Sequence, residues 1–147
     1  MKITDRMWVA YSAWGCVAAA LLHVVAILAG PDWFDFLGAP PEYGESLRRG
    51  DWVEPVVITL GIALVLLIWA AYAFSVLKRI RPLPFMKWAL AIVAFIFIVR
   101  GALGIPIMLW VIFKSGVSAL TLFHLAASIF VLTLGYGFWL AFKMARV

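Results

Sequence analysis

Four ionisable side chains fall inside or at the edge of long apolar stretches of this chain: His23, Glu54, Arg100 and His124. A charge placed in the hydrocarbon of a bilayer costs between about 2.5 and more than 10 kcal/mol, so Arg100 in particular needs a compensating partner. Side chains of these types can form ion pairs, bind an anion or, for two histidines, ligate a haem iron. These four residues are therefore the ones that the helices must position.

Two interpretations of Arg100 stay open. In the first, it forms a structural ion pair with Glu54, or its long stem lets the guanidinium reach the outer headgroups. In the second, it binds an anion or a lipid headgroup. His23 and His124 are either interhelical hydrogen-bond donors or, facing each other in a helical bundle, the two axial ligands of a haem b. The sequence predicts no other metal site, because zinc would need further ligands at that depth.

The composition is that of a membrane protein. The chain of 147 residues is 67% hydrophobic and 13% charged, whereas soluble domains carry roughly 45–50% apolar and about 25% charged residues. We expect a single membrane domain over residues 1–147. The net charge of +5 does not indicate nucleic-acid binding, because most basic residues lie at span ends, where lipid headgroups would face them.

Four stretches are long enough to cross a bilayer, which takes roughly 20 apolar residues. The expected spans are residues 8–29, 54–77, 85–113 and 117–142, with one substantial loop at 30–53. The predicted fold is thus all-α: an antiparallel four-helix transmembrane bundle with an extracytoplasmic amphipathic loop between the first two spans.

The basic residues predict the orientation. One side of the bundle would carry eight of them and the other three: Lys2, Arg6, Lys78, Arg79, Arg81, Lys87, Lys143 and Arg146 against Arg48, Arg49 and Lys114. The positive-inside rule then places both termini in the cytoplasm. We expect a multi-pass protein of a bacterial inner membrane, with membrane lipids around it.

The loop at 30–53 holds five of the seven acids of the chain, interleaved with large apolar side chains. It opens with Gly30-Pro31, which stops a helix. Its aromatic composition favours a partly helical segment at headgroup level, with the rings in the interface. The candidate anchors or partner contacts are Trp33, Phe34, Phe36, Tyr43 and Trp52.

The helical rise of about 1.5 Å per residue places His23, Arg100 and His124 in the outer half of the membrane, with Glu54 above them. Small residues at steps of three and four share a face with the polar residue in three of the spans, as is usual where helices meet closely. In the first span this face consists of Ser12, Gly15, Cys16, Ala19, His23, Ala26 and Gly30. In the second span it consists of Glu54, Ile58, Gly61 and Tyr72, and in the fourth of Thr121, His124, Ser128 and Gly135. We expect them to meet in the bundle core.

The third span contains Gly101, Gly104 and Pro106 next to Arg100. A proline removes one helical hydrogen bond and frees the carbonyl four residues earlier, here that of Ala102. The sequence therefore predicts a kink beside the buried charge.

No nucleophile–base pair, phosphate-binding loop or metal motif is present, so the sequence gives no support for an enzyme. The first functional hypothesis is a non-catalytic membrane protein. It would bind a partner protein, a lipid or a small ligand through the outer polar cluster and the aromatic loop. The partner could be another membrane protein or a second copy of the chain. The second hypothesis is a carrier or channel subunit for a small solute or anion that uses Arg100, and the third is a bis-histidine haem b protein.

Overall fold

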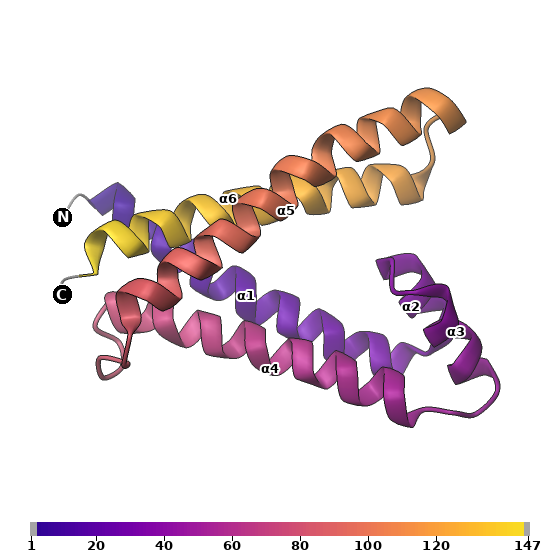
Figure 1. Cartoon of the computed structure of the whole chain (residues 1–147), viewed down its shortest axis with the longest axis horizontal. Helices are drawn as coiled ribbons and strands as arrows, with labels where there is room; N and C mark the ends of the chain where they lie inside the picture. Colours follow the sequence, from indigo (N-terminus) through magenta and orange to yellow (C-terminus); the bar gives the residue numbers. More distant parts are fainter. Residues whose placement is uncertain (1–2, 146–147) are drawn as a thin grey trace. The chain divides into compact units, whose positions relative to one another are not determined.

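The computed structural model describes residues 3–145, and all the regular secondary structure in that range is helical (Figure 1). Lys2 and Arg146, two of the basic residues expected on the cytoplasmic side, lie outside the described residues. The helices are α1 (Ile3–Ala29), α2 (Pro31–Leu37), α3 (Pro41–Arg48), α4 (Val53–Val76), α5 (Met86–Ser115) and α6 (Ala119–Met144). Four of them, α1, α4, α5 and α6, are long and apolar enough to cross a membrane. The predicted all-α, multi-pass membrane fold is confirmed.

The helix ends differ from the predicted spans for local reasons. α1 begins at Ile3 rather than near residue 8, and the negative charge of Asp5 in its first turn interacts favourably with the helix dipole. α6 begins at Ala119 rather than 117, because Ser118 and Thr121 form a capping box. Between α5 and α6, Gly116 has a φ of 84°, a left-handed conformation that glycine adopts without strain.

The helices form two compact units, and α1 and α4 contribute to both. The α5–α6 unit comprises residues 1–15 and 69–147, and the cap unit comprises residues 16–68. Whether residues 1–147 form a single membrane domain stays a prediction.

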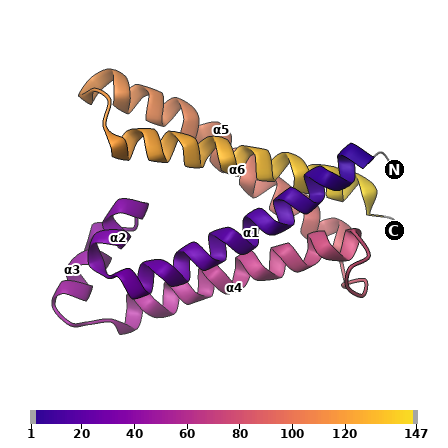
Figure 2. The same ribbon diagram turned by 180° about the vertical axis from the view of Figure 1, so that it is seen from behind.

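In the α5–α6 unit, α5 and α6 form an antiparallel hairpin that glycines bring into close contact (Figures 1 and 2). A Cβ added to Gly101 would lie 2.7 Å from the backbone nitrogen of Leu132, and one on Gly135 would lie 2.8 Å from that of Ile98. The two backbones thus nearly touch. In lipid, where apolar burial gives no advantage over contact with acyl chains, such van der Waals packing is what holds helices together.

Segments of α1 and α4 complete this unit. The Ser12 hydroxyl donates a 2.9 Å hydrogen bond to the Leu134 carbonyl, and Gly137 faces Ser12. From α4, the Trp69 ring meets Phe97 edge to face at 5.2 Å between centroids, and Phe97 in turn lies 5.6 Å from Phe138. Four helical segments therefore pack together within this unit.

The connection between α4 and α5 is held by side chains of α4. The Ser75 hydroxyl donates to the Arg81 carbonyl at 3.0 Å and accepts from the Leu83 N–H at 3.3 Å. The Tyr72 hydroxyl donates to the Pro84 carbonyl at 3.1 Å. The connection is thus an ordered turn rather than a simple polar linker.

In the cap unit, the second half of α1 runs beside the first half of α4 in both views (Figures 1 and 2). The small-residue face of α1 is confirmed here, since Cys16 and Ala26 are buried. The face predicted for α4 is wrong, because Glu54 and Gly61 are exposed. Within the cap unit, the buried residues of α4 are instead Pro55, Thr59, Ala63 and Leu66. Pro55 is fully buried at the helix start, and steps of about one turn from it define the buried face.

We predict that Gly101→Ala destabilises the α5–α6 hairpin, lowering the free energy of unfolding by about 1–3 kcal/mol, as overpacking typically does. The added methyl would meet the Leu132 backbone, which cannot move aside. Unfolding of the purified protein in mixed micelles, titrated with SDS, measures the change.

Gly61→Ala is the matched control, because a Cβ there meets nothing within 4 Å. It should be neutral or stabilising by up to about 1 kcal/mol, the helix propensity difference. Equal effects of the two substitutions would contradict close backbone contact at Gly101.

Candidate functional site

The segment between α1 and α4 is a folded element, which we call the helical cap (residues 30–52). Its two short helices each begin with proline at the first position, Pro31 and Pro41, where the missing N–H costs nothing. Gly38 ends α2 in a left-handed conformation with φ 79°. Phe34 and Leu47 pack with Ala26 of α1 to form a small core. The cap is therefore anchored on α1 by its own apolar contacts.

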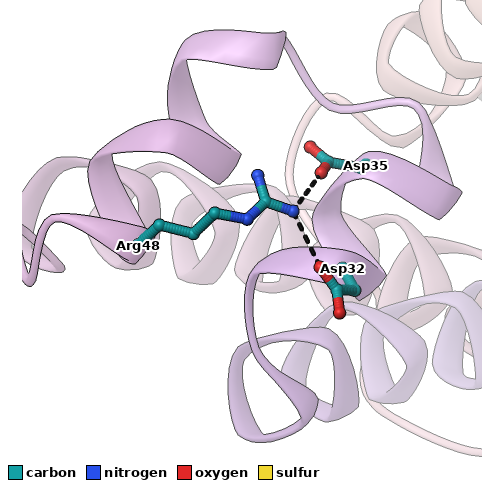
Figure 3. A network of polar contacts seen from close by, with 3 residues as sticks. All are labelled: Asp32, Asp35 and Arg48. Atoms are coloured by element: carbon teal, nitrogen blue, oxygen red, sulfur yellow. Dashed lines mark hydrogen bonds and ion pairs between the residues drawn. The ribbon is translucent and has the colours of Figure 1, made fainter.

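One arginine joins the two helices of the cap. In Figure 3, the Arg48 guanidinium of α3 extends between two carboxylates of α2. Its Nη2 donates to Asp32 at 2.7 Å and to Asp35 at 2.6 Å. Hydrogen bonds to Asp35 and Asp32 raise the pKa of Arg48 above its usual value. The guanidinium thus stays charged, and it fixes α2 against α3 from the solvent side.

Gly44 lets the two helices approach. A Cβ at this position would collide with the Asp35 carboxylate, so a larger residue would displace the side chain that pairs with Arg48. This network could not be predicted from the sequence, because Arg48 lies far along the chain from both acids and no helical spacing relates them. A glycine in the middle of a short helix was the one available signal.

The aromatic residues of the cap divide into two groups. Trp33, Phe36 and Trp52 are exposed, by 41%, 39% and 41%. The rings of Trp33 and Phe36 meet edge to face with 6.2 Å between centroids. Phe34, expected among the outward aromatics, is only 3% exposed and lies in the cap core. The helical period explains the difference: Phe34 and Leu37, three residues apart, share the inner face, where Tyr43 also packs.

The four ionisable residues of the spans divide between the units: His23 and Glu54 belong to the cap unit, and Arg100 and His124 to the α5–α6 unit. Their convergence on one site stays a prediction. Within the cap unit, half-buried His23 donates its Nδ1–H to the Ala19 carbonyl at 2.7 Å. This bond satisfies one ring nitrogen within the same helix. Glu54 is exposed in the first turn of α4.

Arg100 is exposed on α5. At about 1.5 Å per residue, it lies about 21 Å from the start of the helix and about 22 Å from its end. The sequence has no Asp or Glu after Glu54. The one acid among the described residues of the α5–α6 unit, Asp5, lies in the first turn of α1. Arg100 therefore has no carboxylate at its own depth within this unit.

His124 is half-buried on α6, with its ring edge against Phe123 at 5.4 Å between centroids. Ser128 does not pair with the His124 ring: its hydroxyl donates to the His124 backbone carbonyl at 2.8 Å. Ser128 in turn faces Gly104 of α5. The haem b interpretation, which requires His23 and His124 to face each other, stays a prediction.

The glycines near Arg100 pack α5 against α6, and the kink predicted at Gly101, Gly104 and Pro106 stays a prediction. α5 is continuous from Met86 to Ser115 with Pro106 inside it. Gly101 and Gly104 are the contact points with α6. Close packing therefore accounts for both glycines.

Within residues 3–145, no group of three or more His, Cys, Asp or Glu side chains could hold a metal ion. Comparison of the sequence with protein-family models finds no match, and no curated protein or solved structure shows significant similarity to the chain. The helical cap, with its fixed core and exposed aromatic edge, is therefore the candidate binding site that the geometry supports best.

We predict that Arg48→Gln loosens the cap, because one substitution removes both ion pairs between α2 and α3. Amide hydrogen exchange should accelerate over residues 31–48, while the thermal unfolding of the spans stays the same. Arg49→Gln is the matched control, since Arg49 follows α3 directly and its contacts with Glu45 at 3.7 Å and Ser46 at 3.3 Å both stay on α3. Equal exchange in the two variants would show that Arg48 does not hold the cap.

Proposed function

We propose that this chain is a non-catalytic protein of a bacterial inner membrane that binds a partner protein through the helical cap. The observation that carries the proposal is the cap's construction. Phe34, Leu47 and Arg48 fix its fold, and Trp33, Phe36 and Trp52 are left on its surface. Exposed tryptophan on a rigid support is typical of the residues that dominate binding at protein interfaces.

The charge of the cap indicates the chemistry of the partner. Residues 30–53 contain five acids and two arginines, and Arg48 is occupied by Asp32 and Asp35. An acidic surface is repelled by anionic lipid headgroups and attracted by basic protein surfaces. A partner with a basic patch around an apolar pocket would complement Trp33 and Phe36.

The proposed orientation puts both termini in the cytoplasm and the cap on the outer side. Contacts within the α5–α6 unit support it. Arg6 of α1 and Arg79 after α4 line one groove, and Lys87 of α5 lies 6.0 Å from the Phe142 ring of α6. Lys143 follows Phe142 in the last turn of α6. Basic residues of four helical segments thus gather at one end of this unit, as the positive-inside rule requires of a cytoplasmic end.

We predict that a photoreactive phenylalanine analogue at position 33 or 36 forms a discrete protein adduct in living cells. The same analogue at Phe113, which is 85% exposed near the end of α5, is the control and should give none. Reversing charge with Asp51→Lys should weaken the adduct, because it removes part of the attraction for a basic partner. Adducts with lipid alone, or with a second copy alone, would contradict the proposal.

A second candidate function rests on Arg100. A cation near the middle of a span, in a unit without a carboxylate at that depth, is suited to a small anion as its counter-charge. The protein would then be a carrier or channel subunit for anions. The route would have to run along the exposed side of α5, where Arg100 lies.

If this candidate function is correct, purified protein in liposomes should conduct chloride or nitrate. Arg100→Gln should lower the anion flux at least about ten-fold, because a hydrogen bond to a charged group is worth about 1.5–3 kcal/mol. Lys114→Gln, which removes a cation from the last turn of α5, should leave the flux unchanged. Flux that is independent of Arg100 would exclude this function.

A further inference from the structure

A groove lies beside the start of α5 within the α5–α6 unit. Its volume is about 690 Å³, within the range of roughly 300–1,000 Å³ that small-molecule sites occupy. Leu83 of the α4–α5 connection, Trp88 and Ala91 of α5 and Phe142 of α6 line it, and Lys87 is its charged member. The groove is therefore apolar with a single cation.

The groove lies at the basic end of the unit. Trp88 is 74% exposed and Phe85 is 82% exposed, and tryptophan at a span end sits at headgroup level. The Lys87 ammonium lies 6.0 Å from the centre of the Phe142 ring, so its stem runs beside the groove. An apolar groove at this depth with a cation beside it matches a phospholipid, whose acyl chains and phosphate lie close together.

Charge distinguishes which phospholipid fits. The neighbouring connection carries Lys78, Arg79 and Arg81, and α6 ends with Lys143. Lys143 already lies 3.5 Å from the centre of the Trp139 ring, whereas Lys87 borders the groove itself. Asp5 of α1 is the one acid among the described residues of this unit, so these cations outnumber it. A lipid headgroup with a net negative charge would supply the negative charge that balances these cations.

The backbone holds the aromatic wall of the groove in place. Phe85 has a φ of 52°, in the left-handed region that aromatic residues rarely adopt. It occupies the position before the first turn of α5. Tyr72 and Ser75 fix the preceding residues by hydrogen bonds to the backbone. The groove is thus bordered by an ordered turn.

We propose that this groove binds one acidic phospholipid, with an acyl chain along Trp88, Ala91 and Phe142 and the phosphate beside Lys87. This site is separate from the helical cap, so the lipid and the partner protein proposed for the cap do not compete for the same residues. The lipid would fasten the start of α5 to the end of α6.

The test is native mass spectrometry of the protein in detergent micelles with added phosphatidylglycerol or phosphatidylcholine. The wild type should retain one phosphatidylglycerol in preference to phosphatidylcholine. Lys87→Gln should reduce that preference about five-fold, as expected for one lysine at an anionic surface. Lys87→Arg keeps the charge and should keep the preference.

Ala91→Trp tests the apolar half of the site. It leaves Lys87 in place and fills the groove, so bound phosphatidylglycerol should be lost while thermal unfolding in lipid-free detergent stays near that of the wild type. Lys114→Gln, at the other end of α5, is the control and should bind as the wild type does. Equal retention of the two lipids by the wild type would overturn the proposal. So would phosphatidylglycerol binding that survives both Lys87→Gln and Ala91→Trp.

Discussion

The near-contact of the α5 and α6 backbones is the constraint on which the α5–α6 unit depends. Gly101 lies against Leu132 and Gly135 against Ile98, so neither helix can shift along the other without a collision. Acyl chains solvate leucine as well as another helix does, which leaves close van der Waals contact as the main specific attraction. The other contacts of this unit, including the Ser12 hydrogen bond to Leu134, rely on the surface that this hairpin presents.

The cap unit is stabilised by different physics. Phe34 and Leu47 are buried together with Ala26, and the exposed ion pairs of Arg48 then select one arrangement of α2 and α3. Pairs at the surface add little stability on average, because water screens them. Their value here is geometric. They hold two helices too short to be stable alone in the one orientation that leaves Trp33 and Phe36 outward.

Most of the fold could be predicted from the sequence, because length, apolar composition and the Gly-Pro stop determine four spans and one loop. The small-residue face of α1 was also predictable, since packing in lipid selects for such residues. The face of α4 was not: Gly61 suggested contact, but Pro55 and Thr59 are the residues that pack. The Arg48 network joins residues far apart along the chain, and no helical period could reveal it. Whether His23, Glu54, Arg100 and His124 meet stays a prediction.

Carboxylates are distributed unevenly along the chain, and this affects which partners each part of the protein attracts. From Pro55 onward the sequence contains no Asp or Glu, whereas α5 and α6 carry Lys87, Arg100, Lys114 and Lys143. Six of the seven acids lie between Asp32 and Glu54. The helical cap therefore carries net negative charge, and α5 and α6 carry net positive charge. A partner with net negative charge is therefore repelled by the cap and attracted by α5 and α6, so the sign of a partner's charge indicates which of the two it binds.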